Sequence, residues 1–271
     1  MAVHFFKNVK FSSVYHKYML PASNEIVNMV LSYVKEKTDG RPLAMALDVG
    51  CGTGRYTLPL APHFKKVVGI DISESQINVA KQNTSLDNVS YMVAAAEKLP
   101  MENNSVDLVN AALAAHWFTA ETFTSEAARV LKTEGCLAVH AFYPYTVIEY
   151  KDLSHELNVV MSEVWDTLFQ HKVQSLEHMF SQYHNIYEAI LLKDKEWIRD
   201  IPVKIQMSIP ELIGFIQSVV LYQVFVAKDS KRAEQLLIQA EKRLQKILGE
   251  NADSVQLTVN LKYYCVFACK H

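Results

Sequence analysis

Glycines occupy every second position of residues 50–54, a segment termed here the glycine loop. The loop follows a short apolar run at 44–49 that is typical of a buried strand. Because glycine lacks a side chain, a ligand can lie directly against such a backbone. A second apolar run, 66–72, contains Asp71 near its end, about 20 residues beyond the loop, where a strand-end carboxylate can hold ribose hydroxyls. This spacing predicts a nucleoside-binding site at the edge of a parallel sheet.

The residues around the loop distinguish between two kinds of nucleoside ligand. A dinucleotide-binding loop has the pattern Gly-x-Gly-x-x-Gly, and the third position counted from Gly50 is Arg55. The carboxylate of Asp48 repels a pyrophosphate and suits a cation. S-adenosylmethionine (SAM) carries a ribose, an ammonium group and a sulfonium, but no phosphate. The pattern therefore favours SAM over NAD, whereas the loop alone would also fit a tight turn without a ligand.

The first half of the chain alternates short apolar runs with helical patterns. The runs predict buried strands, and apolar residues three or four positions apart predict helices. This alternation is typical of an α/β fold with a doubly wound parallel sheet. The strands are expected at residues 44–49, 66–72, 89–94, 106–113 and 136–142, with helices between them.

The second half of the chain has a predominantly helical pattern. Residues 144–200 are rich in aromatic side chains and histidine and contain no run that matches the earlier strands. A capping box at 208–211 predicts the start of an apolar helix that continues to residue 227, and an amphipathic helix at 233–247 follows. Alternating apolar residues at 255–269 predict a terminal strand. We expect one core with a helical insertion after the fifth strand.

The composition restricts the functional classes. The chain has 271 residues, a net charge of −2 and only small basic clusters, so a nucleic-acid partner is not expected. Its four cysteines form no CxxC pair, which indicates free thiols in a reducing compartment. The longest uncharged run, 212–227, is shorter than the ~20 residues that span a bilayer, and residues 1–7 lack a signal-peptide pattern. We expect a cytoplasmic protein with a small-molecule substrate and no membrane partner. The sequence pattern does not indicate which oligomeric state the protein adopts.

Residues 44–142 resemble the core of a class I SAM-dependent methyltransferase. Three further stretches resemble the methyltransferase type 11 group, in the subfamily of trans-aconitate methyltransferase: Ala112-Leu113-Ala114-Ala115-His116-Trp117-Phe118, the segment with Tyr15, Tyr18 and Pro21, and residues 216–223. The resemblance implies a Rossmann-like sheet of seven strands with the last strand antiparallel. It implies a single domain with N-terminal cap helices at 1–43, a SAM-binding core at 44–142, a helical lid insertion at 143–205, and C-terminal helices with the last strand at 206–271.

The resemblance also implies which residues bind the cofactor SAM. The glycine loop would surround the methionine part, Asp71 would bind the ribose, and Ile72 would pack on the adenine. Many relatives carry Gly and Asp where this chain has Ala94 and Ala95, which leaves the adenine contacts to the segment after them. The implied cofactor-binding residues are Asp48, Gly50, Cys51, Gly52, Thr53, Gly54, Asp71, Ile72, Ala96 and Glu97.

The acceptor side of the predicted site contains aromatic side chains and one histidine. His116 is the candidate catalytic residue, because an imidazole with a pKa near 7 could act as a base if the acceptor were a hydroxyl. Packing and backbone capping also explain these residue types. The expected pocket residues are Tyr15, Tyr18, His116, Trp117 and Tyr143. The histidines of the insertion lack the i, i+4 spacing of metal ligands, so no metal is expected.

The predicted activity is SAM-dependent methyl transfer to a small polar or acidic metabolite, on oxygen. A SAM donor is already activated, so such an enzyme mainly positions its two reactants and excludes water. An ionised carboxylate acceptor needs no base, which agrees with the lack of an evident acid–base pair. Two alternatives remain open: a SAM-binding regulatory or scaffold protein without turnover, and a methyltransferase of protein or nucleic acid.

Overall fold

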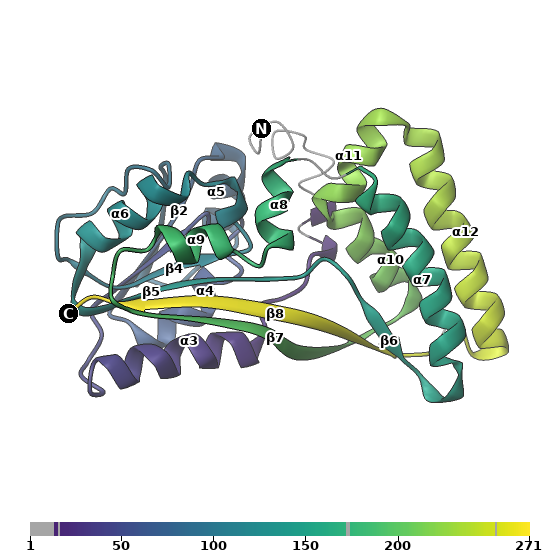
Figure 1. The fold of residues 1–271 in the computed structure, drawn as a ribbon, viewed down its shortest axis with the longest axis horizontal. Helices are drawn as coiled ribbons and strands as arrows, with labels where there is room; N and C mark the ends of the chain where they lie inside the picture. Colours follow the sequence, from purple (N-terminus) through teal and green to yellow (C-terminus); the bar gives the residue numbers. More distant parts are fainter. Residues whose placement is uncertain (1–13, 16, 172–173, 253) are drawn as a thin grey trace.

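The computed structural model describes residues 14–15, 17–171, 174–252 and 254–271, and a twisted mixed sheet forms its centre (Figure 1). Much of the predicted cap region, residues 1–13, lies outside the described residues. The strands are β1 (Met45–Val49), β2 (Lys66–Asp71), β3 (Val89–Val93), β4 (Val106–Ala112), β5 (Leu131–Phe142), β6 (Val147–Glu149), β7 (Asp194–Met207) and β8 (Leu257–Cys269).

The sheet has the topology expected for a doubly wound fold. Its order is β3-β2-β1-β4-β5-β8-β6, and β7 pairs with β8. The pairs among β1 to β5 are parallel, whereas β8 is antiparallel to β5, β6 and β7. The predicted α/β sheet with an antiparallel last strand is thus confirmed. The short β6 is additional to the seven expected strands and pairs with β8 beyond the end of β5.

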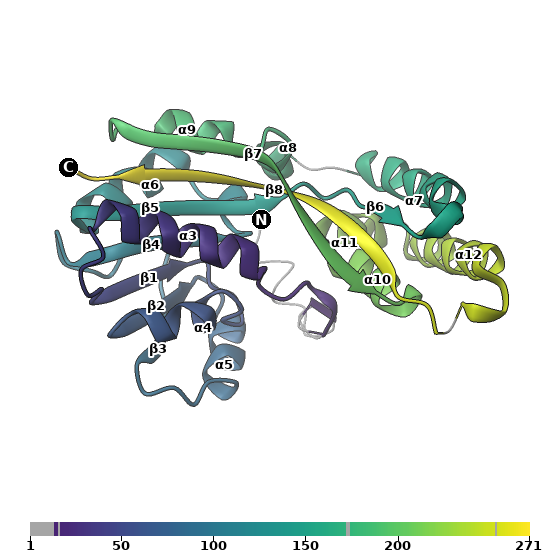
Figure 2. The ribbon, with the colours of Figure 1, turned by 90° about the horizontal axis from the view of Figure 1, so that it is seen from below.

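Helices cover both faces of the sheet and gather at one end of it. In Figure 1, α3 lies on one side of the sheet and α6 and α9 on the other, while α7, α10, α11 and α12 gather at the right-hand end of the molecule, on one side of β6. Figure 2 shows that β7 and β8 extend from the core to this helical end. The helices are α3 (Asn24–Lys37), α4 (Thr57–Leu60), α5 (Glu74–Gln82), α6 (Ala120–Val130), α7 (Ser154–Phe169), α8 (Gln174–Phe180), α9 (His184–Ala189), α10 (Ile209–Ser218), α11 (Val220–Lys228) and α12 (Ser230–Leu248), and the short turn η2 is Ala115–Trp117.

Most of the hydrophobic core forms two layers, one on each face of the sheet. Successive side chains of a strand point to opposite faces. Phe267 of β8 therefore packs in the layer that contains Ile26 of α3, whereas its neighbour Val266 packs in the layer that contains Phe123 of α6. The sheet is buried on both faces, which explains why its central strands are almost continuously apolar.

The expectation that residues 144–200 contain no strand is wrong, because β6 and the first half of β7 lie there. β7 forms an edge strand whose only pairing partner among the described residues is β8. Most of its side chains are half-buried or exposed, so it lacks the apolar run by which the inner strands were recognised. It also contains Pro202, which edge strands tolerate. The predicted boundary between 205 and 206 falls within this strand.

The predicted apolar helix at 212–227 is two helices rather than one. Val219 has an extended backbone, with φ −80° and ψ 145°, and separates α10 from α11. The hydroxyl of Ser218 donates to the carbonyl oxygen of Phe215 at 2.6 Å, a bond that competes with helix continuation. Among the described residues no single helix has the length and apolarity to cross a membrane, and only α10 and α11 together, bent by 72°, meet that test.

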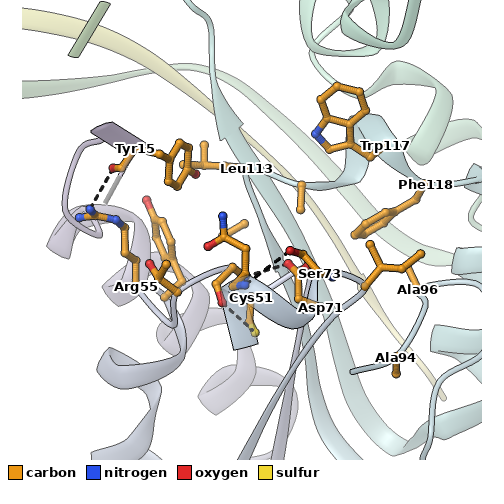
Figure 3. Close-up of a pocket in the computed structure, with 18 of the residues that line it drawn as sticks. Tyr15, Cys51, Arg55, Asp71, Ser73, Ala94, Ala96, Leu113, Trp117 and Phe118 are labelled. Atoms are coloured by element: carbon orange, nitrogen blue, oxygen red, sulfur yellow. Dashed lines mark hydrogen bonds between the residues drawn. The ribbon is translucent and has the colours of Figure 1, made fainter. Parts of the chain in front are cut away.

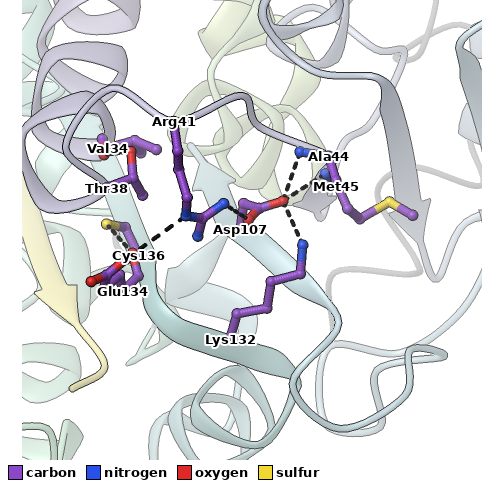
Figure 4. A network of polar contacts seen from close by, with 9 residues as sticks. All are labelled: Val34, Thr38, Arg41, Ala44, Met45, Asp107, Lys132, Glu134 and Cys136. Atoms are coloured by element: carbon purple, nitrogen blue, oxygen red, sulfur yellow. Dashed lines mark hydrogen bonds and ion pairs between the residues drawn. The ribbon is translucent and has the colours of Figure 1, made fainter.

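A buried carboxylate stabilises the end of the sheet that lies opposite the glycine loop. The side chain of Asp107 in β4 accepts bonds from Arg41 Nη1 at 2.7 Å and Lys132 Nζ at 2.9 Å (Figure 4). It also accepts the N–H groups of Ala44 and Met45, both at 2.9 Å. Burial opposes ionisation, but these four donors lower the pKa of Asp107 below its usual value. The network thereby joins the start of β1 to β4 and β5.

Candidate active site

The glycine loop makes its turn at the end of β1 with a backbone that other residues rarely adopt. Gly50, Gly52 and Gly54 have φ values of +68°, +54° and +88°. A Cβ at Gly54 would lie 2.3 Å from the hydroxyl oxygen of Tyr91, so this glycine allows close packing. A Cβ at Gly52 would meet only the Oε1 of Gln76, at 3.9 Å. The backbone at Gly52 therefore faces open space in which a ligand can approach it.

A cavity of ≈ 390 Å³, termed here the loop cavity, lies beside the glycine loop (Figure 3). It is at the carboxyl ends of β1, β2 and β4, where doubly wound sheets bind their ligands. Its lining residues are Tyr15, Gly50, Cys51, Gly52, Thr53, Arg55, Tyr56, Asp71, Ile72, Ser73, Gln76, Ala94, Ala96, Glu97, Ala112, Leu113, Ala114, Trp117 and Phe118.

Asp71 is held in the loop cavity by the backbone of two segments. Its Oδ2 accepts the N–H of Gly52 at 3.0 Å, and its Oδ1 accepts the N–H of Ser73 at 2.8 Å (Figure 3). Burial raises the pKa of Asp71, and these backbone bonds act against that rise. Each carboxylate oxygen retains further acceptor capacity, so Asp71 can also accept bonds from the hydroxyls of a ligand.

Other residues of the loop cavity have surface that a nucleoside would cover. The side chain of Ile72 is an exposed apolar group, with an exposed fraction of 54% for the residue. The Oε1 of Gln76 is buried and has no hydrogen-bond partner among the described residues. The carboxylate of Glu97 accepts the N–H of Thr119 at 3.0 Å. An apolar platform and an acceptor without a donor fit a ligand that has a flat ring and hydrogen-bond donors.

Asp48 does not line the loop cavity, contrary to the expectation that it contacts the ligand. Its carboxylate is buried beneath the glycine loop, where it accepts bonds from Thr57 Oγ1 at 2.6 Å and Asn110 Nδ2 at 2.7 Å. The Oδ1 of Asn110 lies 3.1 Å from Nε2 of His140. Burial raises the pKa of Asp48 to about 6, although its two hydrogen bonds oppose that rise. Gly54 is also absent from the lining, because it packs against Tyr91.

A second cavity, of ≈ 60 Å³ and termed here the apolar cavity, adjoins the loop cavity. Tyr15, Leu113 and Trp117 line both cavities and are called the junction residues. Leu113 has a φ of +55°, a strained backbone for a bulky residue and a feature that is common at functional sites. The apolar cavity is lined by Tyr15, Met19, Leu113, His116, Trp117, Phe142, Pro144, Leu176, Met179, Phe180, Ser218, Val219, Val220 and Leu221.

His116 lines the apolar cavity, but not in the state expected of a base. Burial and the nearby His178 lower its pKa to about 3, well below the expected value near 7. Its Nδ1 lies 3.1 Å from the hydroxyl of Tyr183, which also receives backbone hydrogen bonds from Ala115 and His116. The backbone N–H groups directed at that hydroxyl favour the arrangement in which it donates its proton to Nδ1. In that tautomer the neutral His116 carries its proton on Nε2.

The predicted pocket tyrosines have different positions. Tyr15 is a junction residue, and burial raises its pKa to about 12, so it stays protonated at neutral pH. Tyr18 lines neither cavity, and a Cβ at Gly214 in α10 would lie 2.2 Å from its ring. Tyr143 also lines neither cavity, and its ring packs at 5.6 Å against the ring of Phe180. Packing explains the positions of Tyr18 and Tyr143.

Comparison with known proteins decides the family. Residues 47–139 match the family model described as the methyltransferase domain. A Dictyostelium discoideum protein named as a methyltransferase is 28% identical over 96% of this chain and 95% of its own. A Saccharomyces cerevisiae protein named as a probable S-adenosylmethionine-dependent methyltransferase is 31% identical over 59% of this chain and 53% of its own. Residues 47–139 thus belong to the methyltransferase domain family, and the relatives support a class I SAM-dependent methyltransferase.

Solved structures of other methyltransferases have the same fold. A structure from Anaeromyxobacter dehalogenans, titled as a type II methyltransferase, has a TM-score of 0.69, is 22% identical and covers 89% of this chain and 97% of its own. A structure from Anabaena variabilis, titled as a methyltransferase from an antibiotic biosynthesis pathway, has a TM-score of 0.59 and is 18% identical. The match covers 90% of this chain and 97% of the other. SAM is the cofactor of the methyltransferase described here. Its resemblance to the trans-aconitate subfamily stays a prediction.

The methyltransferase site contains residues that the sequence patterns did not single out as ligands. Arg55 follows the glycine loop and is the only Lys or Arg among the described residues that line the loop cavity. Its Nη2 donates to the carbonyl oxygen of Tyr15 at 3.3 Å (Figure 3). Gln76 and Phe118 also line the cavity. The position of Arg55 directly after the loop was the one signal that could have identified it, since SAM carries a carboxylate.

Outside these cavities, Asp194, Cys269 and His271 form a group that could hold a metal ion. The Oδ2 of Asp194 is 2.7 Å from Nζ of Lys37 and 3.0 Å from Nε2 of His271. The ammonium group of Lys37 thus already meets the charge of this carboxylate. The sequence-based expectation of no metal stays a prediction.

Proposed function

We propose that this methyltransferase transfers a methyl group from SAM in the loop cavity to an oxygen of a small molecule at the junction residues. The observation that carries the proposal is that Tyr15, Leu113 and Trp117 line both cavities. A donor in one cavity and an acceptor in the other would therefore meet at a single place. The net charge of −2 supports a small molecule over a nucleic acid. The predicted cytoplasmic location stays a prediction.

The residues of the loop cavity match the chemical groups of SAM. Asp71 would accept bonds from the ribose hydroxyls, Ile72 would pack on the adenine, and the guanidinium of Arg55 would meet the carboxylate of the methionine part. The glycine loop, with Cys51 and Thr53, would lie along that part. Ala96 and Glu97 would border the adenine. The roles of these residues rest on their positions in the cavity wall.

The acceptor side favours a nucleophile that is already ionised. When bound, SAM supplies a methyl group activated by a sulfonium, which an acceptor oxygen takes by in-line displacement. A carboxylate at the junction has no proton to lose at neutral pH, because its reference pKa is near 4. His116, with its pKa lowered to about 3, is a poor proton acceptor but can donate a hydrogen bond from Nε2. We therefore assign it a positioning role.

The direct test is methyl transfer from SAM labelled with tritium in its methyl group. The purified protein is incubated with carboxylic acids, alcohols, thiols and amines, and in parallel with RNA and protein extract. We expect label in the ester of a small acid, and none in macromolecules. Label only in RNA or protein, or SAM binding without transfer to any compound, would contradict the proposal.

A further inference from the structure

The wall of the apolar cavity is chemically different from that of the loop cavity. Asp71, Glu97 and Arg55 all line the loop cavity. Among the described residues that line the apolar cavity, none is an Asp, Glu, Lys or Arg. Its wall is formed largely by aliphatic, methionine and aromatic side chains. Any charged group inside it would therefore lose its hydration without gaining a counter-charge.

Two polar side chains in this wall, those of His116 and Ser218, already have partners. The Nδ1 of His116 is paired with the hydroxyl of Tyr183, which leaves Nε2 as its remaining polar atom. The hydroxyl of Ser218 is buried and donates to the carbonyl oxygen of Phe215. An ionised carboxylate placed between these groups would be unfavourable, since buried charges need both a counter-charge and hydrogen bonds. The cavity is suited to an apolar group.

We propose that the acceptor has two chemically distinct parts: an oxygen nucleophile at the junction residues and a short apolar group in the apolar cavity. This inference rests on the proposed function and narrows its substrate class. The acidic end of the acceptor lies beside the loop cavity, where the cationic donor binds. The rest of the acceptor is hydrocarbon. The sequence alone predicted a polar or acidic metabolite, and the cavity wall restricts that polarity to the reacting end.

Two segments of the helical half of the chain set the size of this apolar group. Leu176 and Met179 come from α8, whereas Val219 and Leu221 come from the break between α10 and α11 and from the start of α11. Leu176 and Leu221 are buried. The apolar cavity, at ≈ 60 Å³, is much smaller than the loop cavity, at ≈ 390 Å³. A group of only a few carbon atoms fits, and residues such as Leu176 limit its length.

The test measures binding rather than turnover, so it does not depend on knowing the substrate. The protein is saturated with S-adenosylhomocysteine and titrated by calorimetry with straight-chain monocarboxylates of two to ten carbons and with dicarboxylates of the same lengths. We expect monocarboxylate affinity to rise roughly fourfold per methylene until the cavity is filled, and then to fall. Dicarboxylates should bind at least tenfold more weakly than monocarboxylates of equal length.

Variants of the wall test the placement of the hydrocarbon. Leu176→Ala should increase the chain length of the tightest-binding monocarboxylate by two or three carbons. If that variant fails to fold, Leu221→Ala should show the same increase. Leu191→Ala, at a residue that is 93% exposed, is the matched control and should leave the optimum unchanged. Dicarboxylate binding as tight as that of monocarboxylates, or no monocarboxylate binding at all, would overturn the inference. Failure of S-adenosylhomocysteine itself to bind would instead contradict the proposed function.

Discussion

At the scale of single residues, Asp71 carries most of the expected recognition of the ribose. Two backbone N–H groups hold its carboxylate in place, so no reorganisation is needed when hydroxyls bind. We predict that Asp71→Ala weakens SAM binding by about 1.5–3 kcal/mol, the cost of hydrogen bonds to a charged group. Asp87→Ala removes the same charge from an exposed position and is the control. Calorimetry that gave equal affinities for both variants would remove Asp71 from the site.

His116 belongs to the acceptor side, and its loss should affect turnover more than cofactor binding. It lines the apolar cavity but not the loop cavity. We predict that His116→Ala lowers kcat/KM by about threefold to tenfold, the factor expected of one hydrogen bond, and changes SAM affinity by less than about threefold. His155→Ala, at an exposed histidine, should alter neither. Loss of SAM binding in His116→Ala would show that this histidine has been placed wrongly.

Asp48 should make cofactor binding depend on pH near 6. Burial raises its pKa in the folded protein to about 6, so folding favours its protonated form, and its contribution to stability is lost as pH rises through 6. A cation bound above the glycine loop favours the ionised form. SAM should therefore bind more weakly as pH falls below 6 and release a fraction of a proton when it binds near that pH.

Proton release can be measured by calorimetry at pH 6 in two buffers with different ionisation enthalpies. We predict that the observed binding enthalpy depends on the buffer for the wild type and much less for Asp48→Asn. Asparagine retains both contacts of Asp48, since the hydroxyl of Thr57 can accept as well as donate. Equal proton release by the two proteins would exclude Asp48 as its source.

Spacing predicted which residues gather at the site better than it predicted their orientation. Asp71 and the loop glycines were located because neighbouring parallel strands end at one edge of the sheet. Gly54 packs against Tyr91, whereas a Cβ at Gly52 would have space. Tyr91 lies in β3, far from the glycine loop in the sequence. The state of His116 depends likewise on Tyr183, far along the chain. Local spacing does not predict partners of this kind.

At the scale of elements, the effect of backbone strain in the glycine loop can be distinguished from the loop's role in binding SAM. Gly52 and Gly40 both have positive φ, +54° and +69°, and a Cβ at either would have space. We predict that Gly52→Val abolishes SAM binding, whereas Gly40→Val retains it, although the backbone strain costs each about 1–3 kcal/mol of stability. Circular dichroism checks folding and calorimetry checks binding. Normal SAM binding by Gly52→Val would show that the loop is only a turn.

The sequence predicted the strands and helices that bury one face or both faces in the core. The inner strands β1, β2 and β4 are apolar runs because both faces of the sheet are covered. β7 was missed because it is a half-exposed edge strand that owes its conformation to β8. The break between α10 and α11 was missed because apolar residues continue through Val219, and hydropathy does not register a change of backbone direction.

At the scale of the whole molecule, the apolar cavity lies where the sheet meets the helical half of the chain, and it adjoins the loop cavity. The core supplies the loop cavity and one wall of the apolar cavity, through Phe142 and the short turn η2. The opposite wall comes from α8 and from the α10–α11 break. Under the proposed function, donor binding and acceptor selection belong to different parts of the fold, so changes in the helical segments would alter the acceptor without altering the donor site.

The most direct test is a crystal structure of the protein with S-adenosylhomocysteine, the product that remains after methyl transfer. We predict that the ribose hydroxyls lie within hydrogen-bond distance of Asp71 and that the sulfur contacts the junction residues Tyr15, Leu113 and Trp117, facing the apolar cavity. A nucleoside bound away from Asp71, or a sulfur directed away from the junction residues, would contradict the account.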